Sequence, residues 1–212
     1  MNIHSKPEDI ERTSMAIIEA ELERMGLKIP QENLAVVKRA IHTTADFDYA
    51  KNLRFTPDAV RKGIAALAAG AVIVTDTNMA LAGISKPTLA RAGASAHCYM
   101  SDEETARLAK ERSVTRAVIS MERAAKEHPG AIFAIGNAPT ALIRLSELME
   151  DGLQPSLVIG VPVGFVNVVE SKERALDACQ RLGIPAIIAM GRKGGSTVAA
   201  AVCNALMYQK FR

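Results

Sequence analysis

Residues 131–142 read AIFAIGNAPTAL, and this stretch decides the fold. It begins with five apolar residues in succession, the pattern of a strand buried on both faces of a sheet. The run breaks at Gly136 and Asn137. Pro139 then suits the first turn of a helix, where a backbone N–H would have no partner. The stretch predicts a buried strand, a tight turn and a helix in immediate succession.

Four other segments have the composition of short buried strands, and helical segments separate them. The five expected strands cover residues 71–75, 93–100, 131–135, 157–160 and 186–190. Strands that alternate with helices of this length form a parallel sheet with helices on both faces. We therefore predict an α/β fold of three layers, α/β/α, around a five-stranded, mainly parallel sheet.

Three helices are expected before this alternation starts. The first begins at a capping box formed by Ser5 and Glu8 and ends before Gly26. The second covers residues 30–45 and the third residues 56–69. Because these helices precede the alternating pattern, we expect them to pack on the edge of the sheet or on a partner.

No stretch rich in Gly, Ser or Pro divides the chain. We predict one domain over residues 1–212, in which the N-terminal helices of residues 5–69 pack on an α/β core of residues 70–212. Within the N-terminal part, residues 47–55 have a mixed composition and are expected to form a loop.

Composition narrows the class of function. The net charge is only +3, aromatic residues make up 4% and Trp is absent, which argues against a nucleic-acid partner. The three cysteines have no spacing suited to zinc and are expected to be free thiols. There is no signal-peptide pattern and no apolar run of about 20 residues. We predict a soluble, cytoplasmic protein that does not bind a membrane.

Four strand ends are expected to meet at one edge of the sheet, where α/β proteins bind ligands. They carry Asp76, the pair Gly136 and Asn137, the loop at residues 160–164 and the loop at residues 191–195. Glycines allow the backbone to approach a ligand, and helix N-termini direct N–H groups toward it.

The last of these loops predicts an anion site. Residues 191–197 read GRKGGST and combine two cations, free amides and a helix start. The alternative is a tight turn without a ligand. Neither the P-loop spacing nor a GxGxxG motif after a strand is present, and no cluster of metal ligands is evident.

His42 is the best candidate for an acid or base, since imidazole alone has an ordinary pKa near neutrality. Arg39 lies three residues earlier on the same helix and could bring an acidic substrate to it. The alternative is an exposed His paired with Asp46. Ser14 lies on the apolar stripe of the first helix, where it either bonds to its own helix backbone or lines a ligand site.

Three motifs are distinctive as a set. They read AIGNAPTAL at residues 134–142, GVPVGFV at 160–166 followed by ESK at 170–172, and GRKGGS at 191–196. In this order and spacing they resemble the precorrin-8X methylmutase family, and the resemblance covers essentially the whole chain.

This resemblance implies an isomerase on the route to vitamin B12. Members of the family move one methyl group between adjacent carbons of precorrin-8X or cobalt-precorrin-8, giving hydrogenobyrinate or cobyrinate. It also implies a flavodoxin-like fold, a homodimer with the site near the subunit interface, and no cofactor or metal site of the protein's own. Any cobalt would arrive within the substrate.

The resemblance also assigns roles to residues. His42 matches the catalytic His of the family, and Arg39, Arg116 and Arg192 become expected ligands for the carboxylates of the macrocycle. The helix-one contact could be Thr13 or Ser14, and we choose Ser14 because it precedes the run Met, Ala, Ile, Ile. The predicted substrate-binding residues are Ser14, Arg39, Asp76, Arg116, Gly136, Asn137, Gly164, Arg192, Gly194, Gly195 and Ser196.

Two other functions stay open at this point. A non-catalytic carrier of a corrinoid acid would need the same loops and arginines, and only His42 separates it from an enzyme. A nucleotide-binding α/β enzyme is suggested by the fold class alone and is disfavoured by the missing motifs.

Overall fold

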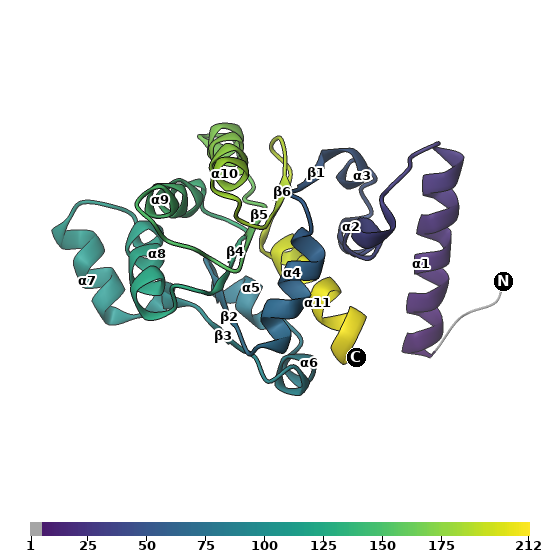
Figure 1. Cartoon of the computed structure of the whole chain (residues 1–212), viewed down its shortest axis with the longest axis horizontal. Helices are drawn as coiled ribbons and strands as arrows, with labels where there is room; N and C mark the ends of the chain where they lie inside the picture. Colours follow the sequence, from purple (N-terminus) through teal and green to yellow (C-terminus); the bar gives the residue numbers. More distant parts are fainter. Residues whose placement is uncertain (1–5) are drawn as a thin grey trace.

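A six-stranded sheet organises the computed structural model, which describes residues 6–212 (Figure 1). The strands are β1 (Leu53–Phe55), β2 (Val72–Thr75), β3 (Ser95–His97), β4 (Ile132–Ile135), β5 (Leu157–Gly160) and β6 (Ala186–Ala189). They lie in the order β1-β6-β5-β4-β2-β3, and only the β1–β6 pair is antiparallel. The five parallel strands follow the flavodoxin-like order, with a topological switch point between β2 and β4. The predicted α/β fold is confirmed, with one strand more than expected.

The additional strand lies in residues 47–55, so the loop predicted there is wrong. This segment forms helix α3 (Tyr49–Asn52) and then β1, which places Leu53 opposite Ala189 and Phe55 opposite Ile187. Three residues are too few to give a periodic pattern in the sequence. The strand forms because it supplies hydrogen-bond partners to the outer edge of β6.

Successive side chains of the central strand enter two different cores. Ile132 and Ala134 belong to the core that also contains residues of α2, α4 and α11, whereas Phe133 and Ile135 belong to the core that contains residues of α8, α9 and α10. Side chains in a strand alternate between the two faces. A continuous apolar run therefore gives a strand that is buried on both sides, as the opening stretch predicts.

Helices cover both faces of the sheet (Figure 1). They are α1 (Pro7–Arg24), α2 (Gln31–Thr44), α3, α4 (Ala59–Ala68), α5 (Asn78–Gly83), α6 (Lys86–Arg91), the 3-10 turn η1 (Tyr99–Ser101), α7 (Glu103–Glu111), α8 (Arg116–Glu127), α9 (Pro139–Glu150), α10 (Val168–Leu182) and α11 (Ser196–Phe211). The predicted N-cap Ser5 lies outside the described residues. In the part of the chain that is described, no helix combines the length and apolar character needed to cross a membrane, and the cytoplasmic location stays a prediction.

Helix α1 lies at one end of the molecule and packs against α2 (Figure 1). Its Glu11 binds two arginines, Arg39 of α2 and Arg212 at the C-terminus. Both guanidinium groups also lie over the ring of Tyr208 in α11, at 5.1 and 4.9 Å from its centre. The hydrogen bond from Arg212, followed by the contacts of Arg39, lowers the pKa of Glu11 to about 2. A charged cluster thus joins α1 to the core.

We expect Glu11→Gln to reduce the free energy of unfolding at pH 7 by about 1–2 kcal/mol, since it leaves the partly buried Arg39 and the exposed Arg212 without the Glu11 carboxylate. The folded-state pKa of Glu11 lies below the ordinary value of 4.5. The contribution of the Glu11 carboxylate to the free energy of unfolding is therefore complete above pH 4.5 and is lost as the pH falls toward 2. Chemical denaturation followed by circular dichroism at pH 7 and pH 3 measures both effects.

The matched control is Glu23→Gln, an exposed carboxylate on the same helix. This change should leave stability within about 0.5 kcal/mol of the wild type. An equal effect of the two substitutions would show that Glu11 does not hold α1 on the core.

Candidate functional site

The loops that follow the parallel strands meet at one edge of the sheet. Thr77, after β2, and Ser196, the first residue of α11, bond through their hydroxyls at 2.8 Å. The Gly195 amide donates to the carbonyl of Val161 at 2.8 Å, which joins the loops after β5 and β6. The carboxyl ends of these strands therefore form one continuous rim, as a parallel sheet predicts.

Asp76 lies beneath this rim and is fully buried. Its carboxylate accepts hydrogen bonds from the amides of Gly136, Asn137 and Ala138 at 2.7–2.8 Å. Burial raises the pKa of Asp76, and the three amide bonds act in the opposite direction. Asp76 was expected to bind substrate directly. In the structure its carboxylate instead holds the turn between β4 and α9 through these three hydrogen bonds.

The glycines of the rim allow the loops to contact one another. A Cβ atom on Gly194 would lie 2.1 Å from the carbonyl oxygen of Val161, and one on Gly136 would lie 2.8 Å from the Cα of Ser196. Gly164 and Gly195 have φ values of +143° and +133°, which side chains rarely tolerate. The space beside Gly136 and Gly194 is thus filled by protein, so any contact with substrate from these residues comes from the backbone.

The guanidinium groups of two arginines at the rim have no polar partner. Arg116 begins α8, next to the hydroxyl contact of Thr115 with Thr140 at 3.1 Å, and Arg192 lies in the loop after β6. Both side chains are exposed, and within residues 6–212 they are the arginine side chains without a hydrogen bond or ion pair. The Arg192 guanidinium lies 5.7 Å from the ring centre of Phe165. Positive charge is therefore available at this edge for an acidic ligand.

A second part of the candidate site lies between α1 and α2. The Oγ atom of Ser14 lies 2.7 Å from Nδ1 of His42, so the two residues are hydrogen-bonded across the helices. They line an open, largely apolar cavity of about 560 Å³. Its walls are Ile10, Thr13, Ser14, Ile17, Ile18, Ile41, His42, Ala45 and Phe47.

The alternative interpretation, in which His42 pairs with Asp46, is wrong. Asp46 instead binds Lys193 at 2.6 Å, and Asp48 binds the same ammonium at 2.6 Å. The contact with Lys193 lowers the pKa of Asp46. Because Lys193 belongs to the loop after β6, this ion pair ties the end of α2 to the rim and places the His42 helix next to it.

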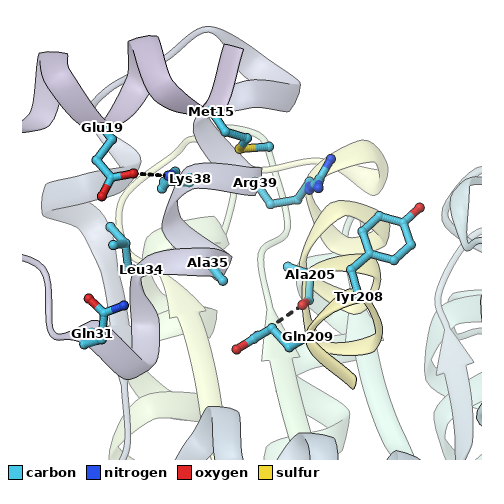
Figure 2. A pocket seen from close by; sticks show the side chains of 10 residues that line it. All are labelled: Met15, Glu19, Gln31, Leu34, Ala35, Lys38, Arg39, Ala205, Tyr208 and Gln209. Atoms are coloured by element: carbon cyan, nitrogen blue, oxygen red, sulfur yellow. Dashed lines mark hydrogen bonds and ion pairs between the residues drawn. The ribbon is translucent and has the colours of Figure 1, made fainter. Parts of the chain in front are cut away.

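Arg39 and His42 line different cavities, although they are neighbours on α2. Figure 2 shows Arg39 between α1 and α11, in a cavity of about 430 Å³ that also contains Met15 and Tyr208. Its guanidinium is paired with Glu11. A direct contact of Arg39 with a substrate carboxylate stays a prediction, and it would have to compete with this ion pair.

The sequence interpretation did not select the apolar tip of the loop after β5. Val163, Phe165 and Val166 are 44%, 84% and 76% exposed. In the sequence, these residues could have been identified by their position around Gly164, in a loop that follows a buried strand. Exposed apolar side chains at a ligand-binding edge suit contact with an apolar surface of a ligand.

A model of the family described as precorrin-8X methylmutase matches residues 9–209 of the chain. The chain belongs to the precorrin-8X methylmutase family. It is 43% identical over 202 residues to the cobalt-precorrin-8 methylmutase of Priestia megaterium, covering 95% of this chain and 87% of that protein. It is 40% identical to the precorrin-8X methylmutase of Pseudomonas aeruginosa, covering 95% of each.

A solved structure agrees with this assignment. The precorrin-8X methylmutase of Thermus thermophilus superposes with a TM-score of 0.83 at 37% identity, covering 94% of this chain and 96% of that one. The family is one of isomerases, so the chain is an enzyme of the methylmutase class.

In this methylmutase family member, Gly194→Ala should reduce the free energy of unfolding by about 1–3 kcal/mol, since its Cβ would collide with the Val161 carbonyl and force the two loops apart. Denaturant midpoints measure the effect. Gly130→Ala is the control, because a Cβ there has no atom within 4 Å and φ is not in the left-handed region. Equal stability of the two variants would show that the loops do not need to be in contact.

Proposed function

We propose that the chain moves a methyl group between adjacent ring carbons of precorrin-8X or cobalt-precorrin-8, with His42 assisting by proton transfer to the macrocycle. Family membership supports the reaction class. The names of relatives include both substrates, so they do not separate a cobalt-free from a cobalt-containing substrate.

The observation that carries the proposal is the hydrogen bond between Ser14 and His42 in an apolar cavity. It joins two residues that are 28 positions apart in the sequence. In the protonated imidazole, Nδ1–H donates to the Ser14 hydroxyl and Nε2–H is left to transfer its proton. We propose that this Nε2–H is directed at a ring nitrogen of the substrate.

The rearrangement itself conserves atoms and electrons. The methyl group leaves one carbon and bonds to the next, and the double bonds of the macrocycle shift to compensate. Protonation of, or a hydrogen bond to, a ring nitrogen withdraws electron density and lowers the barrier. General acid assistance of this kind contributes roughly 10²–10⁴ in rate.

The rim would supply substrate binding and orientation. We propose that Arg116 and Arg192 pair with peripheral carboxylates, a task that suits the planar guanidinium group. Asn137 is exposed at the turn that Asp76 orders and can bond to an acid arm. Such contacts fix the orientation of the substrate when it binds, so less translational and rotational entropy is lost in reaching the transition state.

We also propose that a second copy of the chain completes the site. The cavity at His42 is open, and two residues of its wall on α1, Ile10 and Ile17, are 46% and 63% exposed. A macrocycle with several acid arms extends beyond a cavity of about 560 Å³. A homodimer in which α1 contacts the partner would bury the isoleucines and enclose the substrate.

We expect His42→Asn to lower kcat by roughly 10²–10⁴ while the affinity for the coloured product changes little. Ser14→Ala should lower kcat about tenfold, because the imidazole loses the hydrogen bond that orients its ring. The visible spectrum follows both turnover and product binding.

Thr13→Val is the matched control for Ser14→Ala, since Thr13 lines the same cavity and has no bond to His42. Near wild-type turnover of His42→Asn would rule out the proposed role. A wild-type protein that binds the product and converts neither substrate would indicate a corrinoid carrier.

Ile17→Glu should weaken self-association at least tenfold, because it introduces a charge into the proposed contact between subunits. Sedimentation velocity measures the effect. Met79→Glu is the control, since Met79 is 67% exposed on α5. A fully active wild-type monomer would contradict the dimer proposal.

A further inference from the structure

Lys172 is a buried cation of α10 that the proposed mechanism does not use. The residue is fully buried, and its ammonium donates to the carbonyls of Gly191 at 2.7 Å and Lys193 at 2.8 Å. Every other lysine in residues 6–212 is at least partly exposed. Across the same residues, no carboxylate forms an ion pair with Lys172.

A buried charge without a counter-ion is costly, and two carbonyl contacts offset only part of that cost. Burial lowers the pKa of Lys172 to about 8. Asp76, the other fully buried charged residue in the described chain, differs because three amides stabilise its charge. The charge of Lys172 thus has no compensation from protein carboxylates.

The two carbonyls that Lys172 binds lie on either side of Arg192. Through them the ammonium holds the loop after β6 in a fixed conformation at the start of α11. This loop presents an unpaired guanidinium and lies next to a helix N-terminus, which favours anions. Lys172 therefore contributes positive charge from beneath the part of the rim where a carboxylate is expected.

We propose that Lys172 is a positioning residue of the substrate site: it holds the 191–195 loop by its carbonyls, and its charge is neutralised when a substrate carboxylate binds at Arg192. The inference rests on the proposed function, because it takes a polycarboxylate macrocycle as the ligand. Lys172 itself need not touch the substrate.

Lys172→Met tests the proposal, since methionine has a similar length and neither donors nor charge. Using hydrogenobyrinate as the probe, we expect the product Kd and the KM of the substrate to rise about tenfold. The value of kcat should change less than threefold, because the Ser14–His42 pair lies on other helices. Lys62→Met, an exposed lysine of α4, is the matched control and should leave all three values unchanged.

Lys172→Gln separates the two parts of the role. A glutamine amide can donate to the carbonyls but carries no charge. Relative to Lys172→Met, we expect Lys172→Gln to recover more of the wild-type melting temperature than of the wild-type affinity for the product. Arg192→Gln, which removes the proposed direct contact, should raise the product Kd at least as much as Lys172→Met.

The pH dependence of product binding gives a readout that a purely structural role would not change. As the pH rises from 7 to 9.5, Lys172 loses its proton, and wild-type affinity should fall about tenfold if binding raises the pKa of Lys172 by one unit. Lys172→Met should lack this dependence. Because the pH dependence is measured on the wild-type protein, it tests the proposal even where a variant fails to fold.

The charged groups around α10 do not mimic this titration. They are Arg192, Lys193, Asp46 and Asp48 at the loop, Arg144, Glu147 and Glu150 on the packed helix α9, and Glu170, Glu173, Arg174, Asp177 and Arg181 on α10 itself. Arginine and carboxylate side chains do not titrate between pH 7 and 9.5. The pKa of Lys193 is raised by Asp46 and Asp48, and burial raises the pKa of Cys179 to about 12.

The two hypotheses fail in different ways. Wild-type protein that neither binds hydrogenobyrinate nor converts either substrate would overturn the proposed function. Wild-type activity together with an unchanged KM, Kd and pH profile in Lys172→Met would overturn the role of Lys172 alone.

Discussion

The carboxylate of Asp76 is the interaction on which the geometry of the site depends. It comes from the end of β2 and accepts three amides from the turn after β4, so it joins the two strands that flank the switch point. These bonds satisfy one buried and two partly buried N–H groups of the turn, and a buried N–H without a partner is costly. The direction in which α9 starts, and the exposure of Asn137 beside it, follow from this one side chain.

The candidate site combines two parts that fold for different reasons. The rim is a consequence of a parallel sheet, in which close glycine contacts bring the loops together. The Ser14–His42 pair depends instead on the packing of α1 against α2, which the Glu11 cluster supports. The ion pairs of Lys193 with Asp46 and Asp48 connect the parts, so the position of the imidazole is coupled to the loop after β6.

Charge is distributed unevenly over the described chain. Most arginines are paired with carboxylates on the surface, whereas Arg116 and Arg192 at the rim are not, and Lys172 beneath it has only carbonyl partners. Ion pairs on the surface contribute little to stability, but they neutralise the charge of the arginines that lie outside the rim. Within residues 6–212, the two arginine side chains without a hydrogen bond or ion pair thus both lie where an acidic macrocycle would bind.

The sequence by itself determined the α/β class, the five parallel strands and the identity of the candidate residues, because buried strands, helix starts and glycine turns leave local patterns. It did not reveal β1, whose three residues become a strand only against the edge of β6. It also could not show that Asp76 is buried, that Arg39 is paired with Glu11, or that Ser14 and His42 meet across two helices. These facts depend on contacts between residues far apart in the chain, and only the tertiary structure decides which partner each polar group finds.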